Sequence, residues 1–173
     1  GVSRALFVSR EKTDTDSVTT ADYTSETTGG GIRYSIPMSE YNALSLSAGI
    51  EDISLASTSA TPPEYQSFID RYPDNLNFNL STGFSKDTRD SILFPRRGFF
   101  RRISAEVGVP GSDLEYYKLS LRGSWYRQLV GRLILNLRGD VGYGDGYGDL
   151  EELPFLKNYY AGGASSVRGF EAR

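Results

Sequence analysis

The chain has 173 residues, a formal net charge of −3, and neither Cys nor His. Without thiols and imidazoles, cysteine or histidine catalysis and thiolate or imidazole metal sites are excluded, and the acidic balance disfavours a nucleic-acid partner. Aromatic residues make up 13% of the chain and Gly occurs 19 times, a composition that favours strands over helices. No apolar run approaches the roughly 20 residues that a membrane helix needs.

Seven segments alternate apolar and polar residues with a period of two. In the clearest, Leu133, Leu135 and Leu137 share one parity, while Arg132, Asn136 and Arg138 share the other. Charges confined to one face are typical of a strand between lipid and a water-filled lumen. We therefore predict an all-β fold, an antiparallel up-and-down transmembrane β-barrel present as an incomplete run of about seven strands. The segments are 2–10, 27–36, 44–50, 75–85, 102–109, 115–126 and 132–144.

The first two segments alternate least regularly, and Gly29-Gly30-Gly31 indicates a bend or bulge in the second. The connections 37–42 and 127–131 are tight, as periplasmic turns are. Residues 11–21, 56–74 and 145 onward form longer polar connections, as outer loops do, and Pro62-Pro63 predicts a short surface helix in the middle one. Connections 87–97 and 110–114 fit this alternation less well.

Aromatic spacing gives a check on length. Tyr117 and Trp125 stand eight residues apart on the apolar parity, which corresponds to roughly 20 Å of depth for a tilted strand. Tyr143 follows on the next strand. We expect Tyr117 and Tyr143 near one membrane boundary and Trp125 near the other, although a soluble β-sandwich would also alternate and would bury such rings in its core.

The most informative run is Tyr160 to Phe170, which contains Gly162-Gly163 and ends in Val167-Arg168-Gly169-Phe170. This glycine-rich loop after a Tyr-Gly-Asp-Gly-Tyr-Gly strand end resembles the signature loop of the BamA family of outer-membrane insertases. In that family the loop folds into the barrel lumen and its arginine pairs with acidic residues on later strands. The resemblance implies that Arg168 forms such a pair, that Gly169 allows the tight turn, and that Phe170 anchors the loop tip.

Other segments resemble the same family in the same order. They are Ile36 to Asn42, Phe94-Pro95-Arg96-Arg97-Gly98, Val109 to Tyr117, and Leu153-Pro154-Phe155. The second is similar to the family's Phe-Pro-Thr-x-Gly turn, with Arg96 where threonine is usual. The resemblance implies that residues 1–173 are the middle strands of a sixteen-stranded barrel and end inside the signature loop. Preceding periplasmic POTRA modules and the first and last barrel strands would then be absent, and no signal peptide is expected at Gly1.

The function implied is that of the central barrel subunit which folds and inserts β-barrel proteins into the bacterial outer membrane. Its expected partners are outer-membrane lipid and lipopolysaccharide, nascent β-barrel clients, and periplasmic lipoproteins bound through the POTRA modules. Two alternatives stay open: a two-partner secretion transporter of the same superfamily, and a porin-like structural protein. A soluble β-protein is a more distant third.

No reaction centre emerges from the residues. The glycine-rich run 142–149 lacks the following helix of a phosphate-binding loop, and Ser165 and Ser166 have no His to activate them. Asp145, Asp149, Glu151 and Glu152 lack the spacing of a calcium loop. We expect no catalytic residue, cofactor or metal, and hence no enzyme.

Overall fold

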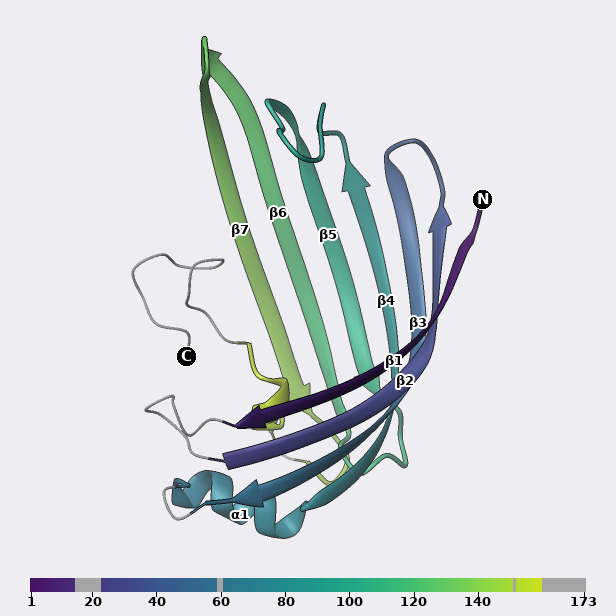
Figure 1. Ribbon diagram of the computed structural model, residues 1–173, viewed down its shortest axis with the longest axis vertical. Helices are drawn as coiled ribbons and strands as arrows, with labels where there is room; N and C mark the ends of the chain where they lie inside the picture. The colour runs from purple at the N-terminus through teal and green to yellow at the C-terminus, as the bar shows by residue number, and fades with distance from the viewer. Residues whose placement is uncertain (15–22, 59–60, 151, 160–173) are drawn as a thin grey trace.

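The computed structural model describes residues 1–14, 23–58, 61–150 and 152–159. Within these residues, seven strands form one antiparallel sheet in which every strand pairs with its neighbours in chain order (Figure 1). This arrangement confirms the predicted up-and-down fold. The strands are β1 (Ser3–Asp14), β2 (Tyr23–Pro37), β3 (Asn42–Ser57), β4 (Asp74–Asp87), β5 (Arg97–Gly108), β6 (Tyr116–Val130) and β7 (Leu133–Gly146).

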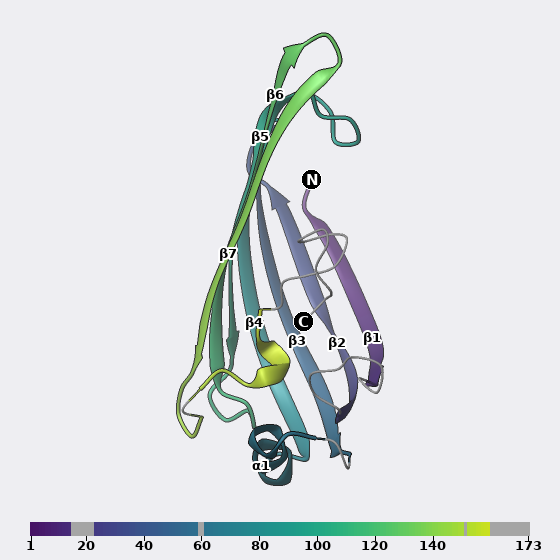
Figure 2. The ribbon, with the colours of Figure 1, turned by 90° about the vertical axis from the view of Figure 1, so that its left-hand side faces the viewer.

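The sheet curves into an open trough with a concave and a convex face (Figure 2). The register sets Leu80 opposite Val107, and Leu121 opposite Val141, so the apolar residues of neighbouring strands share the convex face. Leu135 pairs with Arg127 and Arg138 pairs with Ser124, which puts Leu135 and Arg138 on opposite faces. The predicted single surface of Leu80, Val107, Leu119, Leu121, Leu133, Leu135 and Leu137 is confirmed.

The strands are longer than the alternation predicted. In β3 the prediction ended at Ile50, but the strand continues to Ser57, and its Ile53 and Leu55 are buried on the concave face. In this part of β3 the apolar residues face the concave side, whereas up to Ile50 they face the convex side. The reason is that other parts of the chain cover this end of the concave face, while the middle of that face is polar. A strand defined by one constant apolar parity therefore appeared to stop where its environment changed.

Gly29-Gly30-Gly31 predicted a bend or a bulge in β2, and of these the bulge is wrong, because β2 pairs with both neighbours there without a register shift. These glycines instead allow atoms of the neighbouring strands to approach the β2 backbone closely. A Cβ on Gly31 would lie 2.3 Å from the carbonyl oxygen of Ala48 and 2.9 Å from the ring of Phe7. The irregularity in the described ladders lies between Gln128 and Val130, in the strand leading to the β6–β7 turn.

Successive connections alternate between the two ends of the sheet. Residues 38–41 and 131–132 form tight turns at one end, and Gly131 adopts a φ of 54°. The 88–96 connection lies at this end too, because the Asp87 N–H donates to the Tyr41 carbonyl oxygen at 2.8 Å. We call it the tight-turn end and the opposite one the long-loop end.

At the long-loop end stands helix α1 (Pro63–Arg71), with proline in its first turn as the sequence predicted. A single 3₁₀ turn, η1 (Phe155–Lys157), follows β7. None of the described helices is long and apolar enough to cross a membrane.

Candidate functional site: the concave face

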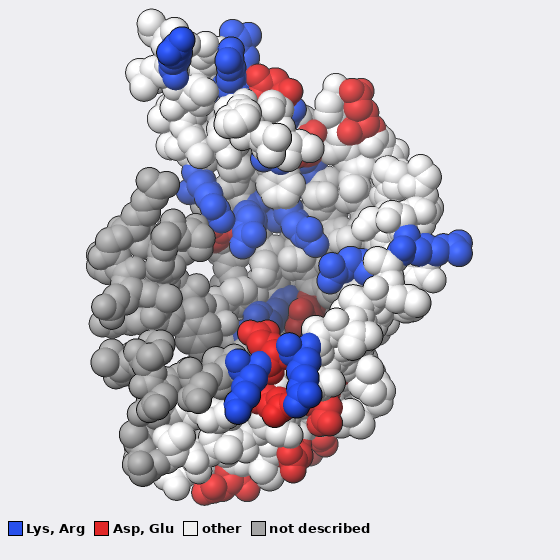
Figure 3. Space-filling model, in the orientation of Figure 1, with Lys and Arg blue, Asp and Glu red and all other residues white. Residues whose placement is uncertain are grey.

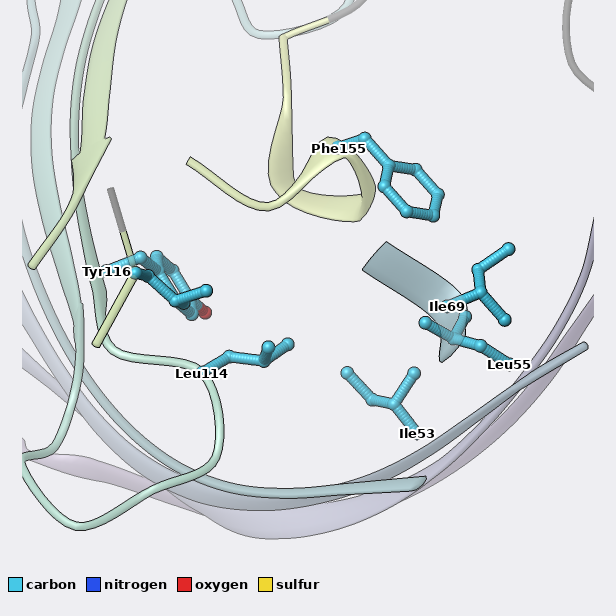
Figure 4. Packing of buried hydrophobic residues seen from close by; sticks show 7 residues of the cluster. Ile53, Leu55, Ile69, Leu114, Tyr116 and Phe155 are labelled. Atoms are coloured by element: carbon cyan, nitrogen blue, oxygen red, sulfur yellow. The ribbon is translucent and has the colours of Figure 1, made fainter. Parts of the chain in front are cut away.

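A buried apolar cluster closes the long-loop end of the concave face (Figure 4). Phe155 of η1 packs edge-on against Tyr23 and Phe68, with ring centroids 5.0 and 5.3 Å apart. These contacts join the segment after β7 to β2 and α1. The buried members are Ile53, Leu55, Ile69, Leu114, Tyr116, Leu150 and Phe155.

Beside this cluster, a polar network ties η1 to the sheet. Lys157 donates a 2.7 Å hydrogen bond to the Glu51 carboxylate of β3, and its ammonium lies 5.4 Å from the ring centroid of Tyr116. The Tyr116 hydroxyl in turn donates to Glu106 of β5 at 2.7 Å. The side chains of Lys157 and Glu51 are both largely withdrawn from solvent, which strengthens the attraction in this ion pair relative to an exposed pair.

Tyr159 continues the attachment toward the middle of the concave face. Its hydroxyl lies 3.0 Å from that of Ser120 and donates to the Leu119 carbonyl oxygen at 2.8 Å. The Lys118 ammonium stands 4.3 Å from the centre of its ring. A Cβ on Gly142 would lie 2.6 Å from two ring atoms of Tyr159, so the ring needs a glycine there. Residues 155–159 are thus held on the concave face up to the edge of the described segment.

A polar hollow of about 270 Å³ occupies the middle of this face. Arg102 donates to the Ser45 hydroxyl at 3.4 Å, and the hydroxyls of Ser47 and Ser81 are 2.6 Å apart. Lys and Arg side chains gather around the hollow in the centre of the molecule (Figure 3). Such a lining suits water, anions or charged protein segments rather than an apolar ligand. It includes Arg33, Ser45, Arg102, Glu106, Lys118 and Ser120.

The 88–96 connection is ordered by Asp90. Its carboxylate accepts the backbone N–H groups of Arg96 and Arg97, at 2.9 and 3.2 Å, and these hydrogen bonds lower the pKa of Asp90 from its usual value. Gly98 ends the turn with a φ of 101°, and a Cβ there would lie 2.2 Å from the Thr88 carbonyl oxygen. The glycine of the Phe94-to-Gly98 motif is therefore a geometric requirement, while Arg96 contributes through its backbone.

The aromatic residues singled out from the sequence occupy two regions of the convex face. Tyr117 and Tyr143 lie together, with ring centroids 6.1 Å apart. Trp125 lies further along β6, opposite Phe99 and Leu137. The loop residues Gly162, Gly163, Val167, Arg168, Gly169 and Phe170 lie outside the described residues.

Sequence reasoning missed Lys157 and Tyr159 as attachment points. The sequence indicated this contact only weakly. Gly142 is a residue without a side chain on the concave face of β7, but a glycine alone does not show which ring occupies the space beside it.

Comparison with known protein families shows to which family the chain belongs. A model of the Omp85 superfamily domain matches residues 1–173. The chain belongs to the Omp85 superfamily.

Relatives within Omp85 narrow the assignment. The outer membrane protein assembly factor BamA of Neisseria meningitidis serogroup B is 34% identical over 159 residues, which cover 87% of this chain and 20% of that protein. BamA of Nitratidesulfovibrio vulgaris is 26% identical over 171 residues, 96% of this chain and 20% of that protein. The chain thus spans about a fifth of the length of these curated relatives.

The fold agrees with a solved structure. BamA from Haemophilus ducreyi lacking POTRA domains 1–3 superposes with a TM-score of 0.89 at 26% identity, covering 99% of this chain and 35% of that one. This Omp85 chain therefore corresponds to part of the BamA barrel region and belongs to the bacterial outer membrane. Its convex face is the lipid-facing surface and its concave face lines the lumen.

Proposed function

We propose that the complete protein is the central barrel subunit that folds and inserts β-barrel proteins into the outer membrane, by binding rather than by catalysis. The observation that carries this proposal is the relationship over nearly the whole chain to two proteins named outer membrane protein assembly factor. Both names favour client assembly over the secretion alternative. In this proposal nascent β-barrel proteins are the clients. The barrel contacts the surrounding lipid and lipopolysaccharide, and periplasmic lipoproteins bind POTRA modules of the complete protein.

Within this function, residues 1–173 supply part of the barrel wall and the start of a lumen loop. The loop carries Val167, Arg168, Gly169 and Phe170, and Arg168 holds it through paired hydrogen bonds to acidic residues of later strands. Support comes from the attachment of Phe155, Lys157 and Tyr159 to the concave face, since a chain held there delivers the following residues into the lumen. Tyr117, Tyr143 and Trp125 contact the two membrane interfaces in this proposal.

The test is complementation of a strain depleted of its own copy by the complete protein. Arg168→Ala should lower folded client barrels in the outer membrane, and Arg168→Lys should restore them only in part, because an ammonium cannot reproduce paired guanidinium bonds. Arg132→Ala, in the exposed β6–β7 turn, is the matched control and should behave as wild type. Normal client levels in the depleted strain would contradict the assembly function. Normal levels with Arg168→Ala alone would contradict only the role of this arginine.

A further inference from the structure

Four cations stand on the lipid-facing convex face at the tight-turn end. The register sets Lys86 directly opposite Arg101, and Arg97 directly opposite Arg127. Like charges directly opposite on one face of a sheet repel each other. Among the described residues, none of these four side chains forms an ion pair with a carboxylate.

Acidic residues of the same face lie elsewhere. Glu26, Asp52, Asp74 and Asp145 share the convex parity but stand toward the long-loop end of their strands. The same parity places Arg10 and Lys12 at the long-loop end of β1, so that end carries both signs of charge. The strands around the four cations at the tight-turn end supply no carboxylate on this face, and in the adjacent connection the Asp90 carboxylate accepts the backbone N–H of Arg97. An anion from outside the described chain would remove their mutual repulsion.

Aromatic rings beside the four cations indicate how deep in the membrane these cations lie. Phe99 pairs with Trp125 between the two rows of cations. The Arg101 guanidinium lies 4.7 Å and the Lys86 ammonium 5.9 Å from the centre of the Phe99 ring. Aromatic residues on a lipid-facing surface mark the boundary between hydrocarbon and head groups, which is where lipid phosphates lie. Gly123, opposite Arg101, has nothing within 4 Å of a Cβ position and leaves open surface beside the guanidinium.

We propose that Lys86, Arg97, Arg101 and Arg127 bind the phosphate of an anionic phospholipid head group in the leaflet at the tight-turn end. Arg101 and Lys86 hold the phosphate beside Gly123, while the acyl chains run along the apolar convex face. The site rests on the outer-membrane location of the family and adds a defined lipid contact to the proposed function.

The test is native mass spectrometry of the complete protein extracted from nanodiscs that contain phosphatidylglycerol and phosphatidylcholine. We expect phosphatidylglycerol to be retained preferentially, and Arg101→Gln or Lys86→Gln to lower its retention by about fivefold each. Arg102→Gln is the matched control, because Arg102 is the next residue but faces the lumen, where it contacts Ser45. It should retain the lipid as wild type does. Arg127→Gln gives a third lipid-facing variant, which should also lower retention of phosphatidylglycerol.

Equal loss in Arg101→Gln and Arg102→Gln would overturn the site, as would equal retention of the two lipids. Binding of inorganic phosphate by lipid-free micelles with the same dependence on Arg101 would assign the cluster to a free anion and overturn the head-group proposal. Client assembly in the complementation strain is read separately, so failure of the lipid site and failure of the assembly function remain distinguishable.

Discussion

The ring of Tyr159 lies where a side chain on Gly142 would have to be, with the missing Cβ only 2.6 Å from ring atoms Cε1 and Cζ. Because β7 carries Gly142 and Tyr159 follows η1, this contact fixes how the chain leaves the strand. It turns back across the concave face toward β6, where the tyrosine hydroxyl donates to the Leu119 carbonyl oxygen.

Replacing Gly142 by Ala should displace the Tyr159 ring. Overpacking of this kind costs about 1–3 kcal/mol, and the free energy of unfolding of the complete protein in micelles, measured by urea titration, should fall by that amount. Gly139→Ala is the control, because nothing lies within 4 Å of a Cβ there. Equal losses from both substitutions would show that any side chain in β7 is harmful and that the contact with Tyr159 is not the cause.

The Lys157–Glu51 ion pair should couple η1 to β3. Lys157→Ala leaves the Glu51 carboxylate partly buried without its cation, so we expect a loss of about 1–3 kcal/mol in the free energy of unfolding. A double-mutant cycle with Glu51→Gln should give a coupling energy of about 1 kcal/mol. Asp52→Asn, at the neighbouring exposed position on the other face, should change stability little. A coupling energy near zero would mean that the pair does not hold the segment.

The Asp90 turn should weaken in acid. Its pKa is lowered in the folded protein by the N–H groups of Arg96 and Arg97. A depressed carboxyl pKa stabilises the folded state above the unfolded value, about 3.9, and this contribution is lost as the pH falls through the folded value. Asp90→Ala should therefore lower the Tm at pH 7, and the difference from wild type should shrink toward pH 3.

Glu40→Ala provides the control for that titration, because Glu40 lies in the 38–41 turn at the same end and its carboxylate accepts no hydrogen bond in the described part of the chain. A Tm difference for Asp90→Ala that stays constant between pH 7 and pH 3 would show that the carboxylate charge contributes nothing.

The faces of the strands could be predicted from the sequence because lipid and lumen impose opposite polarity along most of each strand. Leu135 and Arg138 follow this rule directly. The strand ends could not be predicted in this way. Near the end of β3 the apolar residues Ile53 and Leu55 face the lumen side, because α1 and η1 cover them there. This cover depends on Phe155, about a hundred residues along the chain from β3, and no local period encodes such a contact.

The candidate site was predictable only where a motif marked it. The Gly98 requirement follows from its positive φ and its contact with Thr88, which the Phe94-to-Gly98 motif indicated. By contrast, the pairing of Lys86 with Arg101 depends on the β4–β5 register, and a nine-residue connection does not specify a register.

The proposed assembly function can be measured with the purified complete protein in proteoliposomes, together with its periplasmic lipoproteins. An unfolded β-barrel client is added, and the fraction that acquires heat-resistant electrophoretic mobility is followed over time. We predict that the client folds faster in liposomes with the complete protein than in empty liposomes, and that Arg168→Ala slows this folding while Arg132→Ala does not. Client folding at the same rate with and without the protein would contradict the proposed assembly function.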